Sequence, residues 1–266
     1  MDFAGQVVIV TGGCRGVGRG ITRAFLSAGA DVVVCARRPP DRSDAAGEPP
    51  GSEHRAIFVA ADVREGDDIA KVMDETMSRF GRLDVLVNNA GGSPPMAAAD
   101  ASDRFSASII ALNLLAPLNF AQRANAVMQT QDHGGSIINI GSVSGTRPSP
   151  RTAAYGAAKA GLANLTQTLA VEWAPKVRVN CVVAGMVHTE QSHLFYGDAE
   201  GIAAVGATVP LGRLAEPDDV AQACLFLASG RAAYISGANL MVHGGGELPA
   251  YLGASNAEPA GGPGHR

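Results

Sequence analysis

Short apolar runs alternate along this chain with longer stretches that have a helical pattern. The apolar runs, each typical of a buried β-strand, are Val7–Val10, Val32–Val34, Ile57–Ala60, Leu83–Val87, Ile137–Ile140, Val177–Val183 and Leu240–Val242. The helical stretches are Val17–Ala28, Asp67–Phe80, Phe105–Met128, Ala153–Trp173 and Asp218–Ala228. This alternation predicts βαβ units, and therefore an α/β, Rossmann-like, doubly wound fold with a seven-stranded, mostly parallel sheet and helices on both faces.

Three segments lack such a pattern. Arg38–Arg55 is rich in Pro, Gly, Asp and Ser, which predicts an exposed loop. Thr189–Val209 follows the sixth predicted strand without a strong period, and we expect it to form a lid. Gly253–Arg266 is rich in Gly, Ala and Pro and is expected to be a flexible tail. Because the chain shows no repeat and no linker, we predict one domain over residues 1–252.

Composition narrows the class of protein. With 266 residues, of which 46% are hydrophobic and 17% charged, the chain is long enough for a sizeable core. A net charge of -4 argues against a nucleic-acid-binding protein. No run approaches the roughly 18 apolar residues of a transmembrane helix, and the N-terminus lacks a signal-peptide pattern. We therefore expect no membrane association and a cytoplasmic location.

Cysteines and histidines give no sign of a metal site. The four cysteines have no CxxC spacing, and the six histidines have no zinc spacing. We expect small buried or half-buried thiols, without disulfides or metal, at Cys14, Cys35, Cys181 and Cys224.

Tyr155 and Lys159 carry the strongest chemical signal. Four residues apart on a predicted helix, they lie on one face, one turn apart. A nearby ammonium favours the phenolate, so we expect Lys159 to lower the pKa of Tyr155 from about 10 toward the working pH. Ser142, thirteen residues before Tyr155 and at the end of a predicted strand, would hydrogen-bond a substrate oxygen on which charge develops.

A glycine-rich turn joins the first predicted strand to the first helix. It reads Thr11-Gly-Gly-Cys-Arg-Gly-Val-Gly18, with the spacing GxxxGxG. Glycines in such a turn let the backbone approach a diphosphate, whose charge the helix N-terminus favours. Glycines alone are weak evidence, but the flanking strand and helix strengthen the prediction of a dinucleotide site.

Polar residues follow several predicted strands directly. They are Asp62, Asn88, Ser142 and the segment after Val183. Ligands of doubly wound sheets bind outside the carboxyl ends of the strands, so these residues are expected to gather around one site.

Taken in order, these motifs resemble those of the short-chain dehydrogenase/reductase family, nearly end to end. The matching pieces are the glycine turn at 11–18, Asp62-Val63, the NNAG at 88–91, Asn113, Ser142, Tyr155 with Lys159, Asn180, Gly185-Met-Val-His-Thr189 and Pro210-Leu-Gly-Arg213. One departure is Ala184-Gly185, where the family usually has Pro-Gly; it removes no chemical group.

The resemblance implies a role for each matching residue. Tyr155 would be the general acid or base, and Ser142 would polarise the substrate oxygen. Lys159 would hold the nicotinamide ribose and tune Tyr155, while Asn113 would anchor a water behind the lysine. The coenzyme would be contacted by Thr11, Gly12, Arg15, Gly16, Val17, Gly18, Arg37, Asp62, Val63, Asn89, Ala90, Gly91, Tyr155, Lys159, Gly185, Val187 and Thr189.

The residues after the second strand bear on the choice of coenzyme. An acidic side chain there would bind the ribose 2′-OH of NAD, but the positions hold Ala36, Arg37 and Arg38. Together with Arg15 in the glycine turn, these arginines could pair with a 2′-phosphate. We therefore favour NADP(H), with NAD(H) as the alternative.

The substrate is less constrained. Met96, Met186 and Phe195 could line an apolar pocket, which suggests a 3-oxoacyl thioester or a ketosteroid as the carbonyl substrate. Two alternatives stay open: an NAD-dependent dehydrogenase that oxidises hydroxysteroids or hydroxyacyl thioesters, and a dinucleotide-binding protein without turnover. The resemblance, together with the small residues of the stretch Ala153–Trp173, implies a homotetramer, or failing that a homodimer.

Overall fold

A seven-stranded sheet with the order β3-β2-β1-β4-β5-β6-β7 forms the centre of the computed structural model, which describes residues 1–39 and 56–256. The strands are β1 (Val7–Thr11), β2 (Asp31–Ala36), β3 (Ile57–Ala60), β4 (Val85–Asn88), β5 (Gly135–Ser142), β6 (Val177–Ala184) and β7 (Asn239–Val242). Every neighbouring pair is parallel. The predicted doubly wound fold is confirmed, and its sheet is wholly parallel within the described residues.

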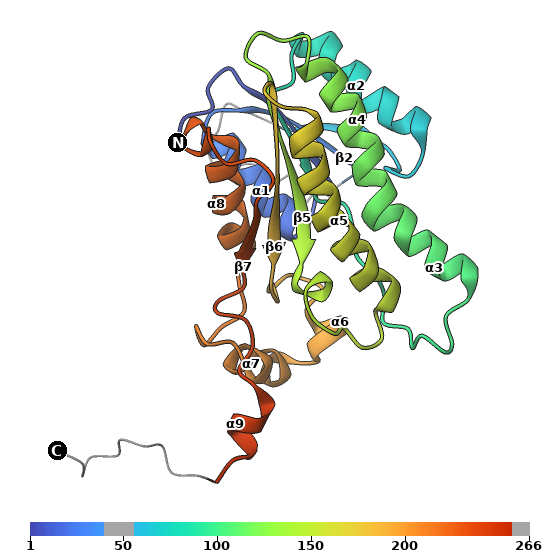
Figure 1. Cartoon of the computed structure of the whole chain (residues 1–266), viewed down its shortest axis with the longest axis vertical. Helices are drawn as coiled ribbons and strands as arrows, with labels where there is room; N and C mark the ends of the chain where they lie inside the picture. The colour runs from blue at the N-terminus through green and yellow to red at the C-terminus, as the bar shows by residue number, and fades with distance from the viewer. Residues whose placement is uncertain (40–55, 257–266) are drawn as a thin grey trace, which may run out of the picture.

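Helices cover both faces of this sheet (Figure 1). One face carries α1 (Gly16–Ser27) and α8 (Pro217–Ala228), and the other carries α2 (Gly66–Phe80), α4 (Ala116–Met128) and α5 (Ala153–Glu172). Because both faces are covered, the central strands β1, β2 and β4 are mostly apolar and buried, as the sequence pattern indicated.

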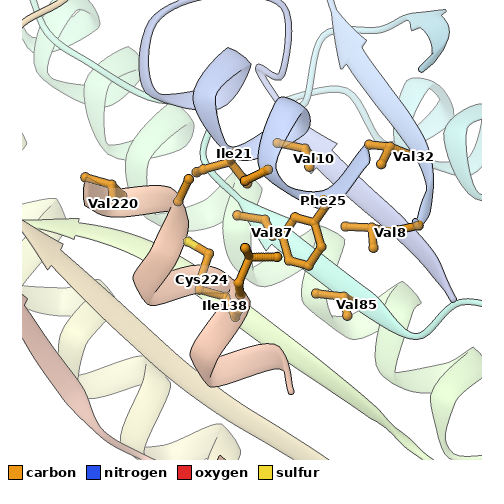
Figure 2. Close-up of a cluster of buried hydrophobic side chains, with 14 of the residues drawn as sticks. Val8, Val10, Ile21, Phe25, Val32, Val85, Val87, Ile138, Val220 and Cys224 are labelled. Atoms are coloured by element: carbon orange, nitrogen blue, oxygen red, sulfur yellow. The ribbon is translucent and has the colours of Figure 1, made fainter. Parts of the chain in front are cut away.

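Figure 2 shows the core between the sheet and the helices α1 and α8. Ile21 and Phe25 of α1, with Val220 and Cys224 of α8, are fully buried there. They pack against the strand residues Val8, Val10, Val85, Val87 and Ile138. This packing fixes the N-terminus of α1 at the carboxyl edge of the sheet. All four cysteines are buried free thiols, as the sequence predicted.

The chain reverses its direction of travel across the sheet between β1 and β4. Successive strands run from β1 to β3 toward one edge and from β4 to β7 toward the other. At such a switch point the connections leave toward opposite faces, and a crevice opens outside the carboxyl ends of the strands. The turns that follow β1, β4, β5 and β6 therefore surround one region.

The predicted helix Phe105–Met128 starts earlier and is interrupted. It begins as α3 (Asp103–Ile110), where the Ser102 side chain accepts a hydrogen bond from the Phe105 N–H at 3.2 Å. A π-helical segment, η2 (Ala111–Leu115), separates α3 from α4, and such segments often mark functional sites. By length and composition alone this stretch could cross a membrane, with a mean hydropathy of 1.3, but α4 packs on the sheet as a core helix does.

The lid and the tail also differ from expectation. Thr189–Val209 contains two helices, α6 (His193–Tyr196) and α7 (Ala199–Ala207). The predicted tail starts inside α9 (Ala250–Ala254), which projects away from the body of the fold in Figure 1. Residues 40–55 of the predicted loop and residues 257–266 of the tail lie outside the described part of the chain.

Candidate active site

Ser142 and Tyr155 meet at the carboxyl end of β5. Ser142 is the last residue of that strand, where it pairs with Ala184 of β6, and Tyr155 lies in the first turn of α5. Burial raises the pKa of the Tyr155 phenol, and a hydrogen bond with the Ser142 side chain opposes that rise. The Ser142 hydroxyl also accepts a hydrogen bond from the Ser144 N–H at 3.2 Å, which fixes its position.

Lys159 lies beneath this pair and is only 4% exposed. Its ammonium donates a hydrogen bond to the Ile140 carbonyl at 2.7 Å and lies 5.6 Å from the centre of the Tyr155 ring. Burial lowers the pKa of Lys159 to about 8, because desolvation disfavours the charged form.

The prediction that Lys159 lowers the pKa of Tyr155 is wrong for this structure. Burial has the largest effect on the phenol, and the resulting pKa lies above its usual value. The physical reason is desolvation: the buried phenol loses the water that would stabilise its charged form, and the nearby ammonium gives its hydrogen bond to the Ile140 carbonyl. Sequence spacing placed the two residues on one helix face, but it could not show where the ammonium would point.

Asn113 is fully buried in the π-helical segment η2. Its amide accepts a hydrogen bond from the Gly92 N–H at 2.9 Å and donates to the Gly92 carbonyl at 3.0 Å. A Cβ atom on Gly91 would lie 2.7 Å from the Asn113 Oδ1 and 3.4 Å from the Lys159 Nζ. Asn113 therefore holds the segment after β4 directly against Lys159.

The segment after β4 is also tied to the glycine turn. The Thr11 hydroxyl accepts hydrogen bonds from the Asn89 and Ala90 N–H groups, both at 2.9 Å. The Asn89 amide donates to the Thr11 carbonyl at 2.9 Å. These bonds bring together the predicted coenzyme residues of β1 and β4, which are 78 positions apart.

Asp62 and Arg37 lie at the ends of neighbouring strands, β3 and β2. Hydrogen bonds from Arg64 hold the pKa of the Asp62 carboxyl below its usual value, and the charge of Arg37 adds to this effect. The Arg64 guanidinium contacts the carboxylate at 2.9 and 2.5 Å. Val63 beside it is buried, whereas Arg37 is exposed.

The start of the lid is held by residues that sequence reasoning missed. Ser192, only 2% exposed, accepts a hydrogen bond from the Thr189 N–H at 2.9 Å through its hydroxyl. Val187 forms an isolated parallel bridge with Ala215. Glu190 reaches the N-terminus of α1, where its Oε1 accepts a hydrogen bond from the Gly16 N–H at 3.0 Å. No motif marked Ser192 or Glu190, because their partners lie elsewhere along the chain or in the folded lid.

A cavity of about 220 Å³ opens beside Val143, which follows Ser142, and beside Gly185, outside the ends of β5, β6 and β7. It is lined by Val143, Thr146, Arg147, Gly185, Met186, Met241, His243, Gly246 and Glu247. Of the three apolar residues predicted to line a pocket, Met186 does so. Met96 and Phe195 are not among the lining residues, and Phe195 is 55% exposed. The lining combines apolar residues such as Met186 and Met241 with the polar side chains of Arg147, His243 and Glu247.

Comparison with known proteins identifies the family. A profile described as Enoyl-(Acyl carrier protein) reductase matches residues 12–247. An L-fucose dehydrogenase of Bos taurus is 37% identical over 269 residues, covering 97% of this chain and 95% of that protein. A solved structure of a short-chain type dehydrogenase/reductase from Mycobacterium marinum has a TM-score of 0.84 at 31% identity, covering 93% of this chain and 98% of that one. The chain belongs to the short-chain dehydrogenase/reductase family.

Another relative is much longer. An uncharacterized short-chain type dehydrogenase/reductase of Sinorhizobium fredii is 38% identical over 244 residues, which are 91% of this chain. The matched part is only 43% of that relative's length. Membership of the family makes this short-chain dehydrogenase/reductase an enzyme that acts between CH–OH and C=O groups with NAD(P).

The turn after β1 fits the coenzyme that the family uses. Gly12 has a φ of +66°, and a Cβ atom on Gly18 would lie 2.2 Å from the Gly12 carbonyl oxygen. Only glycine is tolerated in so tight a turn, which leaves bare backbone at the N-terminus of α1. The N-terminus of a helix favours anions, and here the Gly16 N–H donates a hydrogen bond to the Glu190 carboxylate.

Proposed function

We propose that this short-chain dehydrogenase/reductase is an NADP(H)-dependent oxidoreductase that interconverts a carbonyl and a secondary alcohol. The observation that carries the proposal is the convergence of Ser142, Tyr155 and Lys159 at the end of β5, with Asn113 joining Lys159 to the segment after β4. Each residue offers a group that this chemistry needs, and the segment after β4 is bonded to the glycine turn.

In the oxidative direction Tyr155 takes the proton of the substrate hydroxyl, while the carbon loses a hydride, with its two electrons, to become a carbonyl. When bound, the coenzyme supplies the acceptor or donor of that hydride. In the reductive direction Tyr155 returns the proton to the oxygen. Ser142 hydrogen-bonds the substrate oxygen on which negative charge develops, and Lys159 supplies positive charge beneath the ring.

The preference for NADP(H) is supported by the charges around the end of β2. Ala36 leaves no carboxylate to bind a ribose 2′-OH, and both Arg37 and Arg15 are exposed. Arg37 follows β2 directly and influences the pKa of Asp62 after β3 through its charge, and the adenine ribose of doubly wound folds is bound near the carboxyl end of the second strand. A 2′-phosphate there would gain a charge-assisted pairing.

For the substrate, the classes expected from the sequence are a 3-oxoacyl thioester and a ketosteroid. The cavity favours a second candidate, a hydroxyl group of a sugar, because Arg147, His243 and Glu247 line it. Its volume of about 220 Å³ also lies below the roughly 300–1,000 Å³ typical of sites for drug-sized ligands. The similarity to an L-fucose dehydrogenase supports the same candidate.

We further propose a cytoplasmic homotetramer, or a homodimer, with α5 at the interface between subunits. Val171 near the end of α5 is 80% exposed, and Ala153, Ala157 and Ala160 leave another part of the helix surface free of bulky side chains. Mass photometry on the purified full chain would distinguish a tetramer, a dimer and a monomer.

The test of the proposed function follows NADPH and NADH oxidation with 3-oxoacyl thioesters and ketosteroids, and NADP⁺ and NAD⁺ reduction with sugars. The Tyr155→Phe variant serves as the blank. We expect turnover of at least one group of substrates at a rate above this blank, and faster with NADP(H) than with NAD(H). Wild-type rates no higher than the blank with every panel, despite intact coenzyme binding, would contradict the proposal and favour a dinucleotide-binding protein without turnover.

A further inference from the structure

The cavity continues directly from the residues that face the reacting groups. Val143 and Gly185 line it, and they follow Ser142 and Ala184, which are paired at the ends of β5 and β6. A substrate whose oxygen is held by Ser142 therefore has this space beside it for the rest of its structure.

An ion pair spans the two sides of the cavity. Arg147 follows η3 (Val143–Gly145) at the end of β5, and Glu247 follows β7, 100 positions later. The Arg147 guanidinium donates to the Glu247 carboxylate and also, at 3.0 Å, to the Pro148 carbonyl. The two side chains are 37% and 34% exposed, so the pair stands at the accessible mouth of the cavity.

Tyr196 of the lid connects this pair with the catalytic tyrosine. Burial raises the pKa of Tyr196; the charge of Glu247 raises it further, and that of Arg147 lowers it. Tyr196 in turn acts electrostatically on Tyr155. The half-buried Tyr196 is therefore electrostatically coupled to the ion pair and to Tyr155.

The lining determines which ligand chemistry fits. Arg147 and Glu247 neutralise each other, so the cavity offers no net charge to a carboxylate or phosphate. The pair nevertheless presents guanidinium donors beside carboxylate acceptors, and His243 also lines the cavity. Hydroxyl groups, which both donate and accept hydrogen bonds, match such a surface. The small volume disfavours a steroid or a long acyl chain.

We propose that this cavity holds the part of the substrate beyond its reacting carbon, and that the Arg147–Glu247 pair selects a small, neutral, polyhydroxylated substrate. The inference rests on the proposed function and names the substrate class of that site. Arg147 and Glu247 are specificity-determining residues in this scheme.

The test compares kcat/KM for a panel of aldopentoses and aldohexoses with kcat/KM for cyclohexanol, a simple secondary alcohol. Glu247→Gln keeps the size of the side chain and removes its charge. We expect it to lower the ratio of sugar to cyclohexanol kcat/KM by about 10-fold or more, as the loss of a charged hydrogen-bond partner does. The matched control is Glu75→Gln, which removes a carboxylate from the exposed Arg79–Glu75 pair on α2 and should leave the ratio unchanged.

A second variant distinguishes a role in substrate selection from a loss of folding caused by breaking the ion pair. The double exchange Arg147→Glu with Glu247→Arg restores an ion pair with reversed polarity. We expect a thermal unfolding transition close to that of the wild type, which would show that the variant is folded. The order of preference among the sugar stereoisomers should change, because the hydrogen-bond donors and acceptors are exchanged between the two positions. An unaltered order of preference would overturn the assignment.

The outcomes separate this inference from the proposed function. Turnover of cyclohexanol or a ketosteroid without turnover of any sugar would overturn the substrate class while leaving the oxidoreductase proposal standing. An equal loss of sugar and cyclohexanol turnover in Glu247→Gln would overturn the role of the pair. Absence of turnover with every alcohol and carbonyl, at the level of the Tyr155→Phe blank, would remove the proposed function itself.

Discussion

The Lys159 ammonium lies 5.6 Å from the centre of the Tyr155 ring, while its hydrogen bond goes to the Ile140 carbonyl at 2.7 Å. One lysine thus joins the end of β5 to the face of the tyrosine that we propose as the acid–base group. Its burial has a measurable consequence for the pH dependence of stability.

Replacing Tyr155 by Phe should remove the proton relay while keeping the ring. We expect kcat to fall about 10²–10⁴-fold, the range that general acid–base catalysis contributes. Coenzyme affinity, measured by calorimetry, should change little, since most of the proposed contacts lie elsewhere. Tyr234→Phe, at a fully exposed tyrosine, is the matched control and should keep normal kinetics. Near-normal turnover in Tyr155→Phe would refute the assigned role.

The lowered pKa of Lys159 should appear in the pH dependence of stability. Between pH 8 and about 10.5, the usual pKa of the unfolded lysine, the unfolded chain binds a proton that the folded enzyme does not. The free energy of unfolding of the wild type should therefore rise with pH in this window relative to Lys159→Met, by up to about 1.4 kcal/mol per pH unit. Below pH 8 both states bind the proton, and the difference should be constant.

Urea unfolding of both proteins at several pH values from 6.5 to 10 would measure this slope. Comparing the two proteins cancels the titration of the other tyrosines and cysteines, except for Cys181, which interacts with Lys159. Parallel curves from pH 8 to 10 would show that the buried lysine keeps an ordinary pKa.

Arg37→Asp should reverse the coenzyme preference. The carboxylate would accept hydrogen bonds from a ribose 2′-OH and repel a 2′-phosphate. We expect the ratio of kcat/KM with NADPH to that with NADH to fall by roughly 10–100-fold, the worth of a charged hydrogen bond. Arg79→Asp on α2, an exposed arginine far from the turn, controls for the change in net charge. An unchanged ratio of kcat/KM with NADPH to that with NADH would show that residues other than Arg37 set the coenzyme preference.

Gly18→Ala should disrupt the coenzyme turn. The added methyl group would lie 2.2 Å from the Gly12 carbonyl oxygen, a backbone atom that cannot move without shifting β1 or α1. We expect a loss of about 1–3 kcal/mol in the free energy of unfolding, as for an overpacked core, together with weakened coenzyme binding. Gly230→Ala is the matched control, since nothing lies within 4 Å of its new methyl group. Equal stability of the two variants would contradict the geometry described for the turn.

Much of the site could be anticipated because its residues belong to local patterns. The spacing of Tyr155 and Lys159 places them on one helix face wherever that helix lies. Ser142 and Asp62 could be located because the carboxyl ends of parallel strands lie on one edge. Arg147 and Glu247 could not, since they are 100 positions apart in irregular segments and are joined only in the folded chain.

The order of the strands and helices, the parallel sheet and the proposed acid–base pair on α5 could all be read from the sequence alone, because periodicity and short spacings act through local geometry. Tertiary structure decided that the Lys159 ammonium bonds to the Ile140 carbonyl and that the Asn113 amide bonds to Gly92. It also brought Arg147 and Glu247 together at one cavity. These features depend on burial and on contacts between distant segments. Desolvation, which raises the pKa of Tyr155 and lowers that of Lys159, exists only once the chain has packed around them.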